Sequence, residues 1–264
     1  MREAYPPRRQ PIRQEKRLSQ QRMKISALIF RLRFWIHALI FFLGFTAPWD
    51  RWLRLRMDTN GSTWLLISTW IARNGWLTFT TATVVVLVFG IWCALKSAVA
   101  RTWASAYLGP ATVQSWSMHG DTLMAAGPYR YVRNPLYLGI IIHAFALALL
   151  MPPSGAIFAL ATIVAMQLIL IAGEEKFLSA KLGELYKEYL RHVPKLFPAL
   201  RPRVPSSGER PNWLTGIVGE IYFWGVVLSF LTVGWRYNTA LITQGVLISL
   251  GVSLIVRAFM PRRS

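Results

Sequence analysis

Residues that can bind a charged ligand are concentrated in one stretch of the chain, from Gly127 to Gly139. This stretch, called the signature segment below, reads GPYRYVRNPLYLG, and two adjacent carboxylates, Glu174 and Glu175, follow further along the chain. Its arginines can pair with anionic groups, its tyrosines can donate hydrogen bonds, and the carboxylates can pair with a cation. If folding brings the two parts together, they can hold a cationic ligand between them.

Glycine and proline define the backbone of the signature segment. Gly127, with a proline after it, predicts a turn, because glycine reaches backbone conformations that other residues rarely adopt and proline fixes its own φ. Asn134 before Pro135 is pushed away from helical geometry, so a membrane helix is predicted to begin at Pro135. The first-turn amides of residues 136–138 then have no intrahelical partner and can meet an acceptor on a ligand. The alternative interpretation is a basic interfacial loop with a tyrosine belt.

Two apolar segments explain how Glu174 can return to the signature segment. Residues 136–151 and 154–173 are predicted to be helices, and the PPSG sequence at their junction leaves room only for a sharp reversal. The two helices therefore form a transmembrane hairpin. This hairpin places Pro135 and Glu174 on the same side of the membrane.

The apolar runs indicate the class of the protein. The chain has 264 residues, of which 54% are hydrophobic. Several runs carry almost no charge over roughly the 20 residues that a helix needs to cross a bilayer. We predict an all-α fold, a multi-pass transmembrane helical bundle of about six spans with an interfacial helix on the cytoplasmic side.

The charge distribution indicates the orientation and the partners. A net charge of +19 would suggest a nucleic-acid ligand in a soluble protein, but most basic residues lie outside the apolar runs. With both termini inside, 23 of the 30 lysines and arginines fall on the cytoplasmic side, as the positive-inside rule expects. We predict attraction to anionic lipid headgroups and no nucleic acid. Cys93 is the only cysteine and the four histidines lack ligand spacing, so no metal site is predicted.

Composition divides the chain into five regions. Residues 1–24 are rich in Arg, Gln and Pro and have almost nothing to bury, which predicts a disordered cytoplasmic tail. The other predicted regions are N-terminal membrane helices with an interfacial segment (25–95), a core that contains the signature segment (96–198), a linker (199–212) and a C-terminal transmembrane hairpin (213–264).

Within these regions, membrane helices are predicted over residues 25–49 and 76–95 and in the C-terminal hairpin over 213–234 and 240–259. Residues 96–134 are predicted to be a polar loop, and an amphipathic surface helix is predicted to follow Gly173 and to end at Pro194. Glu220 is a carboxylate inside an apolar run, so we expect it to face the bundle or to lie near the interface.

The signature segment, followed by Glu174, Glu175, Gly183, Tyr186, Tyr189, Val193 and Pro194, resembles the isoprenylcysteine carboxyl methyltransferase family, which is related to membrane phospholipid methyltransferases. The resemblance covers residues 96–198, which would then be the catalytic core. It implies an integral membrane enzyme that uses S-adenosyl-L-methionine without the fold of soluble methyltransferases, with an active site that faces the cytoplasm.

The resemblance also implies which residues contact the cofactor. Carried onto this sequence, they are Gln114, Asp121, Thr122, Leu123, Met124, Tyr129, Asn134, Pro135, Leu136, Tyr137 and Glu174. The family often has His at the positions of Asp121 and Asn134, so only backbone contacts are expected to be kept there. No residue is assigned as a catalytic acid or base.

Arg133, Leu170 and Glu175 are the predicted substrate contacts. In the branch that methylates prenylcysteine, an Arg four residues before the first Glu of the pair contacts the substrate, and Leu170 occupies that position here. Leucine cannot form the bidentate pair by which Arg positions a carboxylate. We therefore expect a lipophilic acceptor from the bilayer, such as a lipid amine, hydroxyl or thiol.

Two alternatives stay open at this point. Membrane sterol and enone reductases that use NADPH have a comparable cluster of Arg, Pro and Tyr in their C-terminal region. A non-catalytic membrane scaffold would need the polar cluster to be idle. The sequence does not define the oligomeric state.

Overall fold

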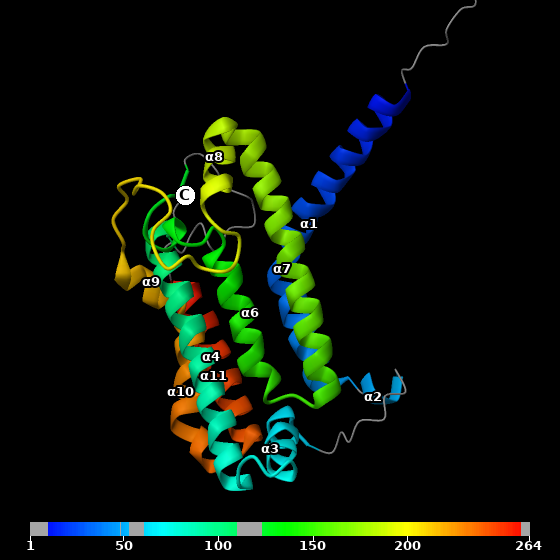
Figure 1. The fold of residues 1–264 in the computed structure, drawn as a ribbon, viewed down its shortest axis with the longest axis vertical. Helices are drawn as coiled ribbons and strands as arrows, with labels where there is room; N and C mark the ends of the chain where they lie inside the picture. Colours follow the sequence, from blue (N-terminus) through cyan, green and yellow to red (C-terminus); the bar gives the residue numbers. More distant parts are fainter. Residues whose placement is uncertain (1–9, 48, 53–60, 110–122, 260–264) are drawn as a thin grey trace, which may run out of the picture.

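The computed structural model describes residues 10–47, 49–52, 61–109 and 123–259. Over these residues it is helical without strands, which confirms the predicted all-α, multi-pass bundle (Figure 1). The α-helices are α1 (Gln10–Thr46), α2 (Trp49–Trp52), α3 (Thr63–Arg73), α4 (Phe79–Leu108), α6 (Pro135–Ala148), α7 (Pro153–Leu182), α8 (Glu184–His192), α9 (Trp213–Gly219), α10 (Ile221–Val233) and α11 (Thr239–Phe259), and the 3-10 helices are η1 (Gly127–Arg130) and η2 (Gly234–Arg236).

Four helical segments in the described part of the chain are long and apolar enough to cross a membrane, namely Leu28–Thr46, Phe79–Leu108, Pro153–Leu182 and Thr239–Phe259. A fifth span results if α9 and α10, which are bent by 68° at their junction, count as one. The predicted span over residues 213–234 is therefore broken at Glu220. α6 has only 14 residues, and at about 1.5 Å per residue it is shorter than the hydrocarbon core.

Three helices are longer than predicted. α1 begins at Gln10, so residues 10–24, predicted to be a disordered tail, are helical. They are rich in Gln, Arg and Lys, which favour helices. α4 continues into the predicted polar loop as far as Leu108, and Arg101 in this added part is paired with Glu220 inside the bundle. α7 likewise continues past Gly173.

The predicted amphipathic helix after Gly173 is divided in two. Its first half is the end of α7, and its second half is α8. Gly183 forms the break with a φ of +59°, which glycine adopts without the steric cost that other residues have. The buried face of α8 consists of Tyr186 and Tyr189.

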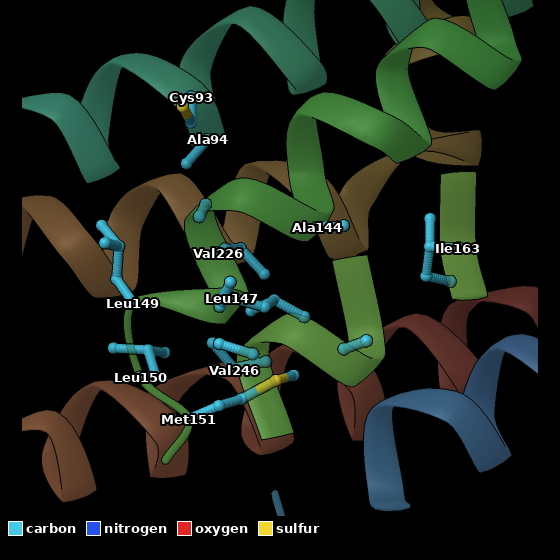
Figure 2. Close-up of a cluster of buried hydrophobic side chains, with 14 of the residues drawn as sticks. Cys93, Ala94, Ala144, Leu147, Leu149, Leu150, Met151, Ile163, Val226 and Val246 are labelled. Atoms are coloured by element: carbon cyan, nitrogen blue, oxygen red, sulfur yellow. The ribbon is translucent and has the colours of Figure 1, made fainter. Parts of the chain in front are cut away.

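The α6–α7 hairpin lies at the centre of the bundle, with α1 against α7, and α4 between α6 and α10 (Figure 1). α1 and α7 approach closely, because a Cβ on Gly155 would lie 1.8 Å from the carbonyl oxygen of Gly44. Figure 2 shows the core that these helices share, with labelled side chains from α4, α6, α7, α10 and α11. Small residues such as Ala94 and Ala144 allow the helices to pack tightly.

The two ends of the bundle differ. At one end, α3 caps the α6–α7 turn, since the amides of Thr63 and Trp64 donate to the carbonyls of Met151 and Leu149 at 2.7 and 2.9 Å. The ring of Trp64 also contacts that of Tyr237, so α3 and the connection between α10 and α11 lie together at this end. The signature segment, α8 and α9 lie at the opposite end (Figure 1).

Candidate active site

The signature segment folds as a turn that leads into a helix, as its prolines predict. Gly127 has a φ of +52°, and a Cβ there would lie 2.3 Å from the ring of Tyr107 on α4. η1 follows, and α6 begins at Pro135. The amide of Leu138 donates to the carbonyl of Asn134 at 3.0 Å. The Leu138 amide therefore has a partner within the helix, whereas it was predicted to have none.

A cavity of about 830 Å³ lies against the signature segment and extends between the helices. Eight predicted cofactor residues line it. They are Leu123, Met124, Tyr129, Asn134, Pro135, Leu136, Tyr137 and Glu174. The structure thus brings together residues from both sides of the hairpin. The other three predicted cofactor residues, Gln114, Asp121 and Thr122, lie outside the described residues.

Glu174 is the acidic residue of this cavity wall, and it is half-buried. The Tyr137 hydroxyl donates to its Oε2 at 2.6 Å, which orients the carboxylate. Arg33 of α1 also lines the cavity and lies within electrostatic range of both residues. A carboxylate held in this way can accept a charge-assisted hydrogen bond from a ligand ammonium group.

Arg133 and Glu175, two of the predicted substrate contacts, form an ion pair with each other. The Arg133 Nε donates to Glu175 Oε1 at 3.0 Å, and its Nη1 donates to the carbonyls of Leu190 and Val193 at 2.6 and 3.0 Å. Arg133 still lies on the cavity wall, whereas Glu175 does not belong to it. The pair fixes α7 and the end of α8 to the signature segment, so we assign it to positioning.

Asn134 completes this junction. Its Nδ2 donates to Glu175 Oε1 and to the carbonyl of Lys195, both at 3.2 Å. An amide N–H₂ has two hydrogens to donate, which matches two acceptors. The side chain that replaces the family's His is therefore occupied by structural contacts.

Residues 199–212, predicted to be a linker, dock along the signature segment through backbone hydrogen bonds. The amides of Ala199 and Arg203 donate to the carbonyls of Tyr131 and Arg130, each at 2.9 Å. The Arg130 Nε donates to the carbonyl of Val204 at 2.9 Å. The segment therefore covers the signature segment and fixes its loop.

Arg101 and Glu220 form a buried bidentate ion pair between α4 and the α9–α10 junction. Arg101 Nε and Nη2 donate to the two Glu220 oxygens at 2.7 and 3.0 Å, and the Ser105 hydroxyl donates to Oε1 at 2.6 Å. Arg101 Nη1 also donates to the carbonyl of Leu136 in the first turn of α6, at 3.2 Å. Glu220 faces the bundle, one of the two predicted placements, and the pair supports the helix that carries Tyr137.

The part of the cavity that lies among the helices contains polar residues that sequence reasoning did not assign to a site. His143 Nε2 lies 3.1 Å from the Tyr222 hydroxyl, and Gln167 Nε2 lies 2.7 Å from His37 Nε2. All four line the cavity. A buried ionisable or amide side chain in an apolar span is a functional signal in itself, and that signal was present at His143 and Gln167.

Leu170 does not line the cavity and packs in the hydrophobic core instead. At 100° per residue, a residue four positions before Glu174 points about 40° to one side of it, whereas a residue seven positions before points about 20° to the other side. The cavity lies on the side of Gln167. Leu170 therefore does not provide the predicted substrate contact.

Three tyrosines in or next to the signature segment are held in the neutral form. Burial raises the pKa of Tyr186 and Tyr189, and it raises the pKa of Tyr129 well above the ordinary value. The Tyr189 hydroxyl donates to the carbonyl of Tyr129 at 2.7 Å. The Tyr129 hydroxyl is buried and has no hydrogen-bond partner among the described residues. It can donate to a ligand in the cavity that it lines.

Comparison with known proteins agrees with the geometry. The family model described as phospholipid methyltransferase (PEMT) matches residues 60–185, which include α3, α4, the signature segment and the α6–α7 hairpin. No curated protein and no solved structure matches the chain. The family match confirms the resemblance predicted from the signature segment: over residues 60–185 the chain is similar to the phospholipid methyltransferases, which indicates a membrane methyltransferase.

Proposed function

We propose that this protein transfers a methyl group from S-adenosyl-L-methionine to a lipophilic acceptor that enters from the bilayer. The observation that carries the proposal is the composition of one continuous cavity. Its one end is polar and built from the signature segment and Glu174. Its other end is apolar and lies among membrane helices, with Phe41, Phe45 and Leu250 on its wall.

The polar end fits the cofactor in charge and in hydrogen bonding. Glu174 can bind the cofactor's amino group, because Tyr137 engages one carboxylate oxygen and fixes its direction. The buried Tyr129 hydroxyl can donate to a second polar group of the ligand. When bound, S-adenosyl-L-methionine supplies a methyl group on a positively charged sulfur. The chain then has to align the acceptor with that group and exclude water.

The apolar end fits an acceptor with a long hydrocarbon chain. Phenylalanines of α1 and leucines of α11 provide the apolar wall, and both helices belong to the candidate spans. The proposed acceptor group is an amine, hydroxyl or thiol. A neutral amine has the lone pair that forms the new carbon–nitrogen bond as the bond between the methyl carbon and the sulfonium sulfur breaks, which leaves S-adenosyl-L-homocysteine. The methylated amine then releases a proton.

The proposed orientation places the active site at the cytoplasmic surface. The signature segment, α8 and residues 199–212 lie at one end of the bundle and are rich in Arg and Lys. Such residues favour the cytoplasmic side and attract anionic lipid headgroups. Binding at this surface would bring the cavity close to membrane lipids.

A direct binding measurement tests this proposal. Purified protein in detergent is titrated with radiolabelled S-adenosyl-L-methionine and, separately, with NADPH. We expect saturable binding of S-adenosyl-L-methionine alone. Binding of NADPH alone would support a membrane reductase, and binding of neither ligand would support a scaffold.

A further inference from the structure

One buried hydrogen-bond acceptor in the cavity lacks a partner. Gln167, on α7, is fully buried with 0% of its surface exposed, and it lines the cavity. Its Oε1 has no hydrogen-bond partner among the described residues. An unpaired amide oxygen in an apolar interior has a high free-energy cost, which is relieved when a ligand donates to it.

The neighbouring His37 determines which end of the Gln167 amide is free. The His37 Nδ1 is hydrogen-bonded to the backbone carbonyl of Arg33, which can only accept, so Nδ1 carries the hydrogen. Its apolar surroundings favour the neutral ring, and Nε2 is then an acceptor. Gln167 Nε2, at 2.7 Å, must donate to it. The free end of the amide is therefore the oxygen.

The position of Gln167 agrees with that of the acceptor group. Gln167 precedes Glu174 by two helical turns on nearly the same face, so it lies about 10 Å deeper in the bilayer. It therefore lies between the polar end of the cavity and Phe41 and Phe45 of α1. This is where the polar head of a lipophilic acceptor would meet the cofactor.

We propose that Gln167 Oε1 binds the head of the methyl acceptor, and that the acceptor therefore carries an N–H or O–H hydrogen. This inference rests on the proposed function and narrows its substrate class. An amine or a hydroxyl can donate to Oε1. A carboxylate cannot, because it would place acceptor against acceptor. His37 acts as a positioning residue that holds the amide in this orientation.

Two probes with the same hydrocarbon chain test the inference. Hexadecan-1-ol has a hydroxyl hydrogen, and 1-methoxyhexadecane lacks one. Their dissociation constants are measured with the purified protein in detergent, in the presence of saturating S-adenosyl-L-homocysteine, which lacks the transferable methyl group and so cannot convert the alcohol into the ether. We expect the alcohol to bind roughly tenfold more tightly than the ether, which corresponds to one hydrogen bond in an apolar site.

Variants show whether the preference for the alcohol comes from a hydrogen bond to Gln167. Gln167→Leu should weaken binding of the alcohol, so that the two probes bind about equally. His37→Leu should also reduce it, but by improving binding of the ether, since the amide can then turn and present its N–H₂. Thr162→Val is the matched control, because Thr162 lies on the same helix and bonds only to backbone carbonyls of α7. It should keep the wild-type ratio.

Each outcome decides the matter. Equal binding of the probes to the wild type, or an undiminished ratio in a Gln167→Leu protein that still binds S-adenosyl-L-methionine, would overturn the inference and leave the proposed function intact. A wild type that does not bind S-adenosyl-L-methionine would contradict the proposed function instead. If Gln167→Leu does not fold, Gln167→Met and His37→Leu provide the same comparison.

Discussion

The Tyr137 hydroxyl lies 2.6 Å from the Glu174 carboxylate, and this contact joins residues 37 positions apart in the sequence. The α6–α7 hairpin produces it, because the hairpin returns the end of α7 to the first turn of α6. The contact connects the signature segment to the acidic residue of the cavity wall. It is the structural basis of the proposed cofactor site.

The first prediction concerns this carboxylate. Glu174→Gln keeps the shape of the side chain and removes its charge, so the affinity for S-adenosyl-L-methionine should fall by about 1.5–3 kcal/mol. Tyr137→Phe leaves the charge in place and should cost about 1 kcal/mol. Both are measured by equilibrium binding in detergent. Unchanged affinity in a folded Glu174→Gln protein would remove Glu174 from the site.

The second prediction concerns the buried ion pair. Glu220→Leu leaves the Arg101 charge without its partner, and stability should fall by about 3–5 kcal/mol. The double variant Arg101→Leu/Glu220→Leu should lose less stability than Glu220→Leu alone, because it leaves no unpaired charge buried. Thermal unfolding in detergent measures this. Equal losses in the single and double variants would mean that the pair does not control the stability of this junction.

The third prediction concerns Gly139, the last residue of the signature segment. A Cβ there would lie 2.4 Å from Arg101 Cγ, and that side chain cannot move easily because Glu220 and the Leu136 carbonyl hold it. Gly139→Ala should therefore lower stability by about 1–3 kcal/mol. Gly251→Ala on α11 is the control, since its Cβ would meet no atom within 4 Å. If both variants melt like the wild type, the proposed close contact is wrong.

The fourth prediction is a pH dependence of stability. Burial raises the pKa of the Tyr186 phenol above its ordinary value, so the folded protein keeps the proton at a pH where the unfolded chain has lost it. This contribution is fully present below about pH 10 and is lost as the pH rises further. Tyr186→Phe should therefore lose less stability than the wild type between neutral and strongly alkaline pH. Parallel melting curves for the two proteins would contradict this.

Sequence reasoning was most successful where local signals define the backbone. The proline at 135 located the start of α6, and the PPSG sequence located the hairpin, so Tyr137 and Glu174 could be placed together. The spacing of four residues failed for Leu170, because 40° of rotation is enough to move a side chain from a cavity wall into the core.

Other contacts are poorly indicated by the sequence around the residues that form them. Arg101 finds its partner 119 positions away, and Glu220 inside an apolar run was the only indication of it. Docking of residues 199–212 depends mostly on backbone groups, which leave no residue pattern. The pairing of His37 with Gln167 depends on the packing of α1 against α7, which hydropathy does not define.

Methyl transfer to membrane lipids is the most direct test of the central claim. Wild-type protein and Glu174→Gln are incubated with methyl-labelled S-adenosyl-L-methionine and native membrane lipids, and separately with a farnesylated cysteine analogue. We predict label in the lipid fraction with the wild type, less with the variant at limiting cofactor, and none in the cysteine analogue. For a lipid amine, the rate should rise with pH until the amine is neutral. Label in the cysteine analogue alone would contradict the proposed acceptor class, and no label in either would contradict methyl transfer itself.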